Sequence, residues 1–421
     1  MTETTPVLEF DRLKEAVKGS AAAFRCRRRL QPAGGEGDKV FPPTFAGAVY
    51  AIEQRHVPGR NGPVTCVLLD SVQSQANRME LALQDAIDAG RIKMPLLVVD
   101  FSDHGPTGDI EADKKAGRLI DAVGKVTSLQ VPHRLADAIL RDSELNGVAF
   151  RLSAKGKALN QVGLANATPL FELCPTALVF GMWDSTGPKG GLGPKFERAI
   201  VSEIVGVGAE VGDLRRGVRR DPLEIRAAVK VKKSADASWA VASPTAAGKD
   251  IVAPSAVNHS SVPFPKQRDK KTDENTYDGV TLEYAEQTTT LSLIGLRRLR
   301  FPVNGAPNAN TDAAARTVLA ALGLAAATLA FDSGAGLRSR CLLWPDGPMQ
   351  WELLDRPGAT PAKFSLSGDA AVKLLNDALT SAETAKLRWA KEPILLKPSQ
   401  ELVKLVRLSQ LEATKESGET A

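Results

Sequence analysis

The sequence predicts a mixed α/β or α+β protein, and three observations favour this class over a β-sandwich or a helical bundle. Apolar, β-branched segments such as 63–70 (PVTCVLLD) and 95–101 (PLLVVDF) are typical of strands. They alternate with segments of helical periodicity such as 71–90, and long basic loops separate the two kinds. No internal repeat occurs at solenoid spacing, and 421 residues suffice for one large domain with insertions or for two to three smaller ones.

Local patterns predict the elements of the first half. Ser71 is the expected N-cap, and Gly90 the expected end, of a helix over 71–90. The other elements, in order, are a helix over 10–24, a basic cluster with a glycine-rich loop over 25–39, strands over 63–70 and 95–101, a loop over 102–118, a strand over 125–131 leading into a helix from His133 to about Asp142, and strands over 168–183 and 195–210 on either side of a glycine-rich loop.

The second half is predicted to resume the sheet after an insertion. Segment 232–277 is rich in Ala, Ser, Pro, Lys and Asp with few large apolar residues, which is typical of a mobile insertion. The expected elements that follow are a sheet segment over 280–293, a helix over 311–331, a hairpin of 338–345 with 350–354, and a helix over 368–389. The chain thus divides into a first part of the core (1–231), the insertion (232–277), completion of the core with a helical region (278–410) and a disordered tail (411–421).

Composition limits the classes of function. The formal net charge is only +5, so clusters of charge matter more than their sum. The four cysteines are scattered singly, without a CxxC pair or a histidine at ligand spacing, which argues against zinc and favours a reducing cytoplasm. The N-terminus lacks a signal-peptide pattern, and the apolar run 318–331 is shorter than the roughly 20 residues of a membrane span. We expect a cytoplasmic protein with a buried helix there and no membrane contact.

The glycine-rich loop 187–195 (GPKGGLGPK) is the first candidate site. A nucleotide-binding P-loop requires GxxxxGK[ST], and here proline stands where lysine should follow Gly193. The GxGxxG pattern also fails, so a nucleotide-hydrolysing loop is disfavoured, while a flexible hairpin remains an alternative. Trp183, Lys189 and Lys195 favour a grip on a nucleic-acid backbone, because glycines let backbone amides approach phosphate and lysines supply charge.

Basic clusters are the second set of candidates. Four arginines within five residues exceed what a solvated helix end requires, although that interpretation stays open. The planar arginine fork suits phosphate oxygens, so a nucleic-acid backbone is a natural partner. For the more isolated candidates, the alternative to RNA binding is that they are ordinary surface residues. On the predicted helix, Arg134 and Arg141 are seven residues apart and would share one face. The basic and polar candidates are Arg25, Arg27, Arg28, Arg29, Lys39, Asn77, Arg78, His133, Arg134, Arg141, Arg297, Arg298 and Arg300.

Enzymatic alternatives depend on acid–base groups. The four histidines are isolated and no GxSxG motif is present. A metal-dependent phosphodiesterase could use carboxylates, although acidic residues in such loops are usually solvated turn formers. These carboxylates are Asp70, Asp100, Asp103, Asp109, Glu111 and Asp113. Aromatic residues are sparse and the stacking signature of RNA-recognition motifs is absent, so RNA would be held mainly by its phosphates.

Several long segments together resemble one family. They are DRLKEAVKGSAAAFR (11–25), LLDSVQSQANRMELAL (68–83), PHRLADAILRDS (132–143), ATPLFELCPTALVFGMWDSTGPKGGLGPKFERAIVSEIVG (167–206), EYAEQTTTLSL (283–293), ARTVLAALGLAA (315–326) and EPILLKPSQELVKLVR (392–407). The family is the RAMP-type backbone subunit of the type I-G (formerly I-U) CRISPR surveillance complex, or Cascade, also called the Csb-one or Cas-seven family. The resemblance spans roughly residues 10–407 and is absent over 232–277.

The resemblance implies an RRM-like (ferredoxin-like) palm with helical and loop insertions in a hand-shaped architecture. It implies a non-catalytic subunit without cofactor or metal, whose copies stack head-to-tail along a CRISPR guide RNA. The guide would pair with target DNA, and a large subunit and a guide-end capping and processing subunit would be partners. A protruding hairpin, the thumb, would kink the guide, and 232–277 is favoured for it over the glycine-rich loop. Related subunits of type III complexes cleave RNA with a loop aspartate, so a metal-dependent ribonuclease stays the alternative.

Overall fold

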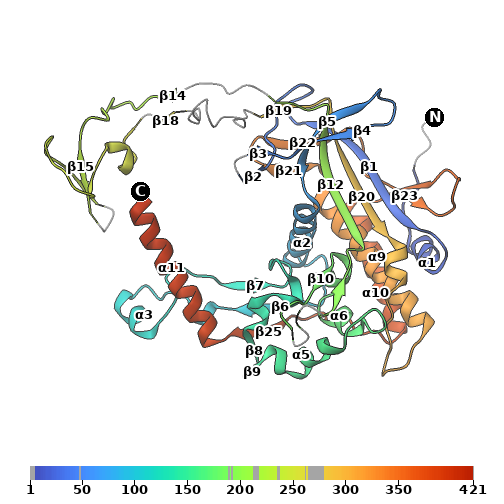
Figure 1. Ribbon diagram of the computed structural model, residues 1–421. Helices are drawn as coiled ribbons and strands as arrows, with labels where there is room; N and C mark the ends of the chain where they lie inside the picture. Colours follow the sequence, from blue (N-terminus) through green and yellow to red (C-terminus); the bar gives the residue numbers. More distant parts are fainter. Residues whose placement is uncertain are drawn as a thin grey trace. The chain divides into compact units, whose positions relative to one another are not determined.

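Figure 1 shows a computed structural model of the chain, which describes residues 5–46, 49–187, 190, 193–211, 218–234, 238–260, 262–263 and 279–420. Lys189 and parts of the expected insertion 232–277 lie outside this set. The chain divides into two compact units. Unit 1 comprises Met1–Phe101, Gly124–Val211 and Gly279–Ser399, and unit 2 comprises Ser102–Val123, Gly212–Asp278 and Gln400–Ala421.

Unit 1 is built on a curled, nine-stranded antiparallel sheet. Seven strands lie side by side in the order β21-β22-β1-β20-β12-β5-β4, and β23 pairs with both β1 and β24. The strands are β1 (Ala23–Pro32), β4 (Ile52–His56), β5 (Pro63–Asp70), β12 (Ile200–Val207), β20 (Tyr284–Ser292), β21 (Ala335–Arg338), β22 (Cys341–Pro345), β23 (Gln350–Leu354) and β24 (Ala362–Ser365). Strands distant in sequence therefore meet in one sheet, with β1 and β20 at its centre.

A layer of helices covers one face of this sheet (Figure 1). It consists of α1 (Phe10–Lys18), α2 (Val72–Asp88), α9 (Ala309–Phe331) and α10 (Gly368–Thr384). α2 packs on β12 and α9 on β20, while α1 and α10 pack on α9. Among the described residues α9 is the one helix whose length and hydropathy suffice for a membrane span, but 78% of that stretch is buried in the protein. The expected buried helix is therefore confirmed, and α9 forms the centre of the core.

Unit 1 contains further small elements. A second sheet has the order β7-β6-β25-β8-β9, with β25 parallel to β6. Its strands are β6 (Leu97–Asp100), β7 (Lys125–Thr127), β8 (Ser143–Leu145), β9 (Val148–Ala149) and β25 (Ile394–Pro398). The short helices are α4 (Ala138–Arg141), α5 (Ala154–Ala158), α6 (Thr168–Leu173), α7 (Thr176–Val179) and α8 (Leu293–Arg297). Two-stranded ladders join β2 (Thr44–Phe45) to β3 (Val49–Tyr50), β10 (Met182–Trp183) to β11 (Lys195–Phe196), and β13 (Glu210–Val211) to β19 (Val280–Thr281).

The described residues of unit 2 form short strands and the α-helices α3 and α11. β14 (Val218–Arg219) pairs with β18 (Val262–Pro263), and β15 (Val231–Lys233) pairs with β16 (Trp239–Val241) and β17 (Ile251–Val252). The helices are α3 (Ile110–Ala116) and α11 (Gln400–Thr420). α11 includes positions 411–420, for which the sequence predicts a disordered tail. Its first turn buries Leu402 and Val403, and the Gln410 side chain accepts a hydrogen bond from the Ile120 N–H, so contacts within unit 2 support the helix.

The mixed architecture agrees with the predicted α+β class, and most expected elements are present. Several local predictions are wrong, among them the loop over 102–118, which contains α3. The helix over 10–24 ends at Lys18, and the basic cluster that follows lies on strand β1. Segment 168–183 forms α6 and α7 before β10, because a short apolar run does not distinguish a buried helix from a strand. The expected hairpin of 338–345 with 350–354 does not form, since β22 and β23 each pair with β1 instead.

Candidate nucleic-acid interface

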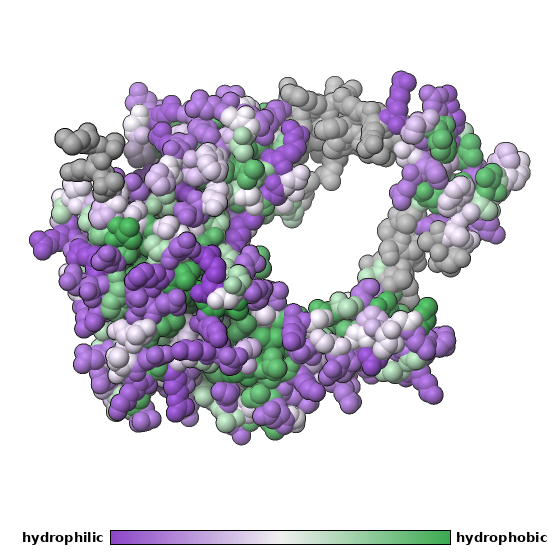
Figure 2. All heavy atoms as spheres, turned by 180° about the vertical axis from the view of Figure 1, so that it is seen from behind, coloured by the Kyte–Doolittle hydropathy of each residue, from purple (hydrophilic) through white to green (hydrophobic). Residues whose placement is uncertain are grey.

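The face of the main sheet opposite the helices carries a row of arginines from β1. Along this strand Cys26 and Arg28 are buried, whereas Arg27 and Arg29 are exposed. Because successive side chains of a strand point to opposite faces, Arg25, Arg27 and Arg29 share the face that the helices leave uncovered. We call this surface, formed by outward side chains of β1, β20, β12, β5 and β4, the open face. Figure 2 shows the molecule from behind, with hydrophilic residues over much of the visible surface.

Two arginines of this row are paired with carboxylates from neighbouring strands. Arg25 Nη2 lies 2.7 Å from Glu352 Oε2 on β23, and Arg27 Nη2 lies 2.8 Å from Glu286 Oε2 on β20. All four side chains are partly exposed to solvent. Such pairs contribute only about 0–1 kcal/mol, so a phosphate could replace the carboxylate at little cost.

Arg29 is the next outward residue of β1, and no ion-pair partner for it occurs within the described part of the chain. Its guanidinium carbon lies 4.2 Å from the centroid of the Tyr284 ring, in a cation–π arrangement. Tyr284 is nearly buried, at 8% exposure, so the ring supports the guanidinium from below. Arg29 is therefore the cation of the arginine row best placed to meet a phosphate.

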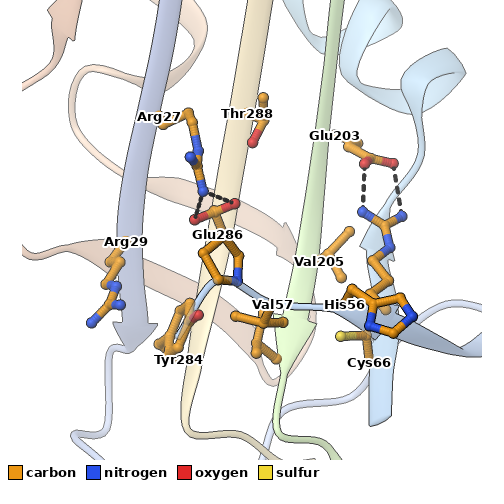
Figure 3. A pocket seen from close by; sticks show the side chains of 13 residues that line it. Arg27, Arg29, His56, Val57, Cys66, Glu203, Val205, Tyr284, Glu286 and Thr288 are labelled. Carbon is orange, nitrogen blue, oxygen red and sulfur yellow. Dashed lines mark hydrogen bonds and ion pairs between the residues drawn. The ribbon is translucent and has the colours of Figure 1, made fainter. Parts of the chain in front are cut away.

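A cavity of about 310 Å³ opens beside Arg29 (Figure 3). Its apolar floor includes Cys66, Val205 and Tyr284. Its rim carries the Arg27–Glu286 pair and a second pair in which Arg55 Nη1 donates to Glu203 Oε1 at 2.8 Å. An apolar floor with an ionic rim suits a ligand part that is flat and apolar with polar edges, such as a nucleobase.

Arg28 points to the other face of β1, which corrects its prediction as an RNA contact. It is 8% exposed; its Nε donates to Gln287 Oε1 at 2.9 Å and its Nη2 to the Phe331 carbonyl at the end of α9. Burial lowers the pKa of this guanidinium. Strand alternation places Arg28 in the core, where it ties β1 to β20 and α9.

Arg78 also has a structural role. Its Nε donates to Asp70 Oδ2 at 2.9 Å, and its Nη2 donates to the Leu337 carbonyl at 2.7 Å. These bonds link α2 to β5 and β21. Its predicted neighbour Asn77 is exposed on α2.

Arg134 is buried as well, at 7% exposure, which corrects its prediction as an RNA contact. Its guanidinium donates two bonds of 2.7 Å to Glu80 on α2 and one of 3.0 Å to the Gly181 carbonyl. Arg134 has φ 50°, a conformation that interrupts helix, and α4 begins only at Ala138. The predicted helix face shared with Arg141 is therefore wrong.

The buried Glu80 carboxylate should make stability depend on pH. Burial raises the pKa of Glu80 from 4.5 to about 7, and the positive charges of Arg134 and Arg198 oppose this rise. The Cys174 thiol is a further titratable group near the Glu80–Arg134 pair. Because the folded state then binds the proton more tightly than the unfolded state, this carboxyl lowers stability as pH rises from about 4.5 to 7. In urea unfolding, we expect the free energy of unfolding of Glu80→Gln to lack this decrease between about pH 4.5 and 7. If the free energies of unfolding of wild type and Glu80→Gln differ by the same amount throughout about pH 4.5 to 7, the raised pKa of Glu80 is wrong.

Two described glycines of the loop 187–195 lie against a second buried ion pair. Arg151 donates to both carboxylate oxygens of Asp184, at 2.6 and 2.9 Å. A Cβ on Gly187 would lie 2.6 Å from the Asp184 carboxylate, and a Cβ on Gly193 would clash with the Asp184 carbonyl oxygen. These two glycines therefore allow close approach to Asp184. A carboxylate in this position disfavours the nucleotide-phosphate interpretation.

The remaining predicted residues are spread over unit 1. His133 and Lys195 are exposed, Trp183 is 52% exposed, and Lys39 is half-buried. Arg141 pairs with Asp142, Arg298 with Glu197 and Arg300 with Asp312, while Arg297 donates to the carbonyls of Gly19 and Ala21. The sequence-based list thus mixes side chains that secure local structure with the outward row of β1.

Sequence reasoning missed the outward residues of the partner strands. Tyr284, Glu286 and Thr288 alternate on β20, and Glu203 and Arg55 face them from β12 and β4. The alternation of EYAEQTTTLSL is a signal that could have identified the first three. Glu203 and Arg55 carry no such local signal, because only the strand order brings them to this face.

The acidic loop candidates of unit 2 have local partners. Asp109 caps α3 by accepting from the Ala112 N–H at 3.0 Å, and Asp113 accepts from the Thr107 N–H at 2.8 Å. Within the described ranges, no group of three or more His, Cys, Asp or Glu residues is arranged to hold a metal ion.

Comparison with protein families finds a match over part of the chain. Residues 24–211 match the family model described as CRISPR-associated protein GSU0053 (Cas_GSU0053). This stretch runs from the start of β1 to β13 and contains the arginine row, α2 and the glycine-rich loop. The match covers less than half of the chain and supports a CRISPR-associated protein. No curated protein matches.

Proposed function

We propose that this protein is a non-catalytic backbone subunit of a type I CRISPR surveillance complex, of the type I-G family that the sequence resembles, and that it carries guide RNA on its open face. The observation that carries the proposal is the arginine row of β1, with Arg29 unpaired in the described structure and two neighbours in exposed, exchangeable pairs. A guide carrier must hold sugar and phosphate and leave base edges free for target DNA. A face of arginines, glutamates paired with them and threonines, with few aromatic residues, meets this requirement.

The strand order supports an RRM-like palm. In chain order, β1, α2, β12, β20, α9 and β22 follow the β-α-β-β-α-β pattern of ferredoxin-like folds. The last of these strands lies beside the first, in the order β22-β1-β20-β12, and both helices pack on one face. The β4–β5 hairpin extends this palm at the β12 edge.

The connection from β12 to β20 is our candidate for the thumb. The ladder of these two strands continues as β13 with β19, and the intervening chain forms β14 with β18 and the sheet β16-β15-β17. Trp239 and Val241 on β16 are exposed, at 44% and 75%. In the glycine-rich loop, the other candidate, the described residues Gly187 and Gly193 lie close to Asp184, which pairs with Arg151.

The proposed setting is a cytoplasmic, RNA-bound filament. Copies would contact one another head-to-tail, with RNA length limiting the copy number, and a large subunit and a guide-end capping and processing subunit would be further partners. Co-expression with a short CRISPR array tests this: we expect large particles on gel filtration with a high 260/280 nm absorbance ratio, shedding RNA only at high salt. An RNA-free monomer at every salt concentration would refute the proposal for the isolated chain. Mg²⁺-dependent RNA cleavage lost in Asp103→Ala or Asp109→Ala would favour the ribonuclease instead.

Arg29→Ala should weaken RNA binding uniformly across sequences. Loss of one phosphate contact is expected to lower the slope of log K against log salt by about 0.7 for a single strand. Filter binding of short RNAs at several salt concentrations measures this slope. Arg91→Ala is the matched control, because Arg91 forms an exposed pair with Asp369 at 2.7 Å, away from the open face. Equal slopes for the two variants would remove Arg29 from the interface.

A further inference from the structure

The hairpin β10–β11 is fixed at its base by two buried ion pairs. Arg134, held by Glu80, donates to the Gly181 carbonyl at 3.0 Å immediately before β10. Arg151 holds Asp184 immediately after β10, and Asp184 is only 3% exposed. Salt bridges from two other segments therefore secure the residues on both sides of Met182 and Trp183.

The return strand is fixed to the same base. Trp183 pairs with Lys195 and Met182 with Phe196, and the Asp184 N–H donates to the Pro194 carbonyl at 3.1 Å. Gly181 has φ 83°, and a Cβ there would lie 3.0 Å from the Phe196 carbonyl oxygen, so the turn into the hairpin requires glycine. The geometry of the two strands is set before any ligand binds.

The two faces of this hairpin differ. Met182 and Phe196 are buried, at 9% and 5% exposure, and pack the hairpin against the rest of unit 1. On the opposite face Trp183 is 52% exposed, and the Lys195 ammonium lies 5.4 Å from its ring centroid. The hairpin therefore presents a half-exposed aromatic ring with a cation over it, in a position where little conformational entropy remains to be lost on binding.

We propose that Trp183 and Lys195 form a stacking site for one unpaired nucleobase of bound RNA, with Lys195 contacting the adjacent phosphate. This inference rests on the proposed function and adds a base contact to the phosphate contacts proposed for the arginine row. Single-stranded nucleic acids are held by base stacking on aromatic rings together with cations along the backbone. The exposed neighbours Glu197, Arg198 and Arg298 are charged, which fits RNA better than the apolar centre of a protein interface.

Short RNA homopolymers test the site. Trp183→Ala should weaken binding of an oligoadenylate roughly tenfold or more, since each stacked base contributes substantially to affinity. The loss of affinity should be larger for the oligoadenylate than for an oligouridylate of equal length. Trp183→Phe should retain most of the affinity. Lys195→Gln should lower the salt slope by about 0.7 without changing the adenylate-to-uridylate ratio. Phe45→Ala, at another exposed aromatic residue of unit 1 with 46% exposure, is the control and should bind as wild type does.

The outcomes separate this inference from the proposed function. A wild-type protein that binds none of these RNAs at low salt contradicts the proposed function itself. If wild type binds and Trp183→Ala binds equally well with the same base ratio, the stacking site is wrong while the open face stands. Normal RNA affinity of Trp183→Ala with smaller particles on gel filtration would assign Trp183 to a contact between copies and overturn the inference. Tryptophan fluorescence is an independent measure: RNA should quench wild type more than Trp183→Phe.

Discussion

Replacing Arg134 with alanine is expected to lower the free energy of unfolding by about 3–5 kcal/mol, because Glu80 would become a buried carboxylate without its counter-charge. The two side chains are 9% and 3% exposed and are joined by two bonds of 2.7 Å. The change also removes the donor to the Gly181 carbonyl, so the hairpin carrying Trp183 would lose one of its attachments. Urea unfolding followed by circular dichroism measures the loss, and RNA binding measures its effect on the hairpin.

Two comparisons make this result specific to the buried pair. Arg91→Ala breaks the exposed pair with Asp369, whose side chains are 40% and 97% exposed, and should cost at most about 1 kcal/mol. The double variant Glu80→Ala/Arg134→Ala should recover part of the lost stability, since no lone charge stays buried. If Arg134→Ala is as stable as Arg91→Ala, the pair is not an important part of the fold.

Trp351→Ala should cost about 3–5 kcal/mol, the range for truncating a fully buried large aromatic side chain. Trp351 is 0% exposed on β23, where it lies opposite Phe364 of β24. The next residue, Glu352, points to the opposite side of β23 and pairs with Arg25 of the arginine row. Loss of packing behind β23 should therefore also disturb one end of the arginine row, which RNA binding at moderate salt would detect alongside the unfolding measurement.

Trp351→Phe separates the effect of lost packing from the effect of the unsatisfied indole N–H. Trp351 Nε1 is buried, and no hydrogen-bond partner for it exists among the described residues. Phenylalanine keeps most of the apolar volume and removes the unsatisfied donor, so its cost should stay below about 1.5 kcal/mol. A phenylalanine variant as unstable as the alanine variant would mean that the indole N–H has a partner that matters to the fold.

The basic cluster at the start of the chain shows what local patterns omit. Four arginines in five residues made this segment a candidate interface, but did not predict that it forms a strand. Only as a strand does alternation separate Arg28, which bonds Gln287 and Phe331 in the core, from Arg27 and Arg29 on the open face. Similarly, Arg134 has the same charge as Arg29, yet it lies within the core because Glu80 on α2 supplies a counter-charge there.

The sequence by itself determined the α+β class, the buried helix α9, the strands β5, β12 and β20 and the helix α2, because periodicity and capping are properties of short segments. It also indicated a CRISPR-associated protein, which the family match over residues 24–211 supports. Only the tertiary structure decided which arginines reach solvent, which are paired and what surrounds Trp183. Those properties depend on strand order and on contacts between residues far apart in the chain, such as Arg25 with Glu352, and no local pattern encodes them.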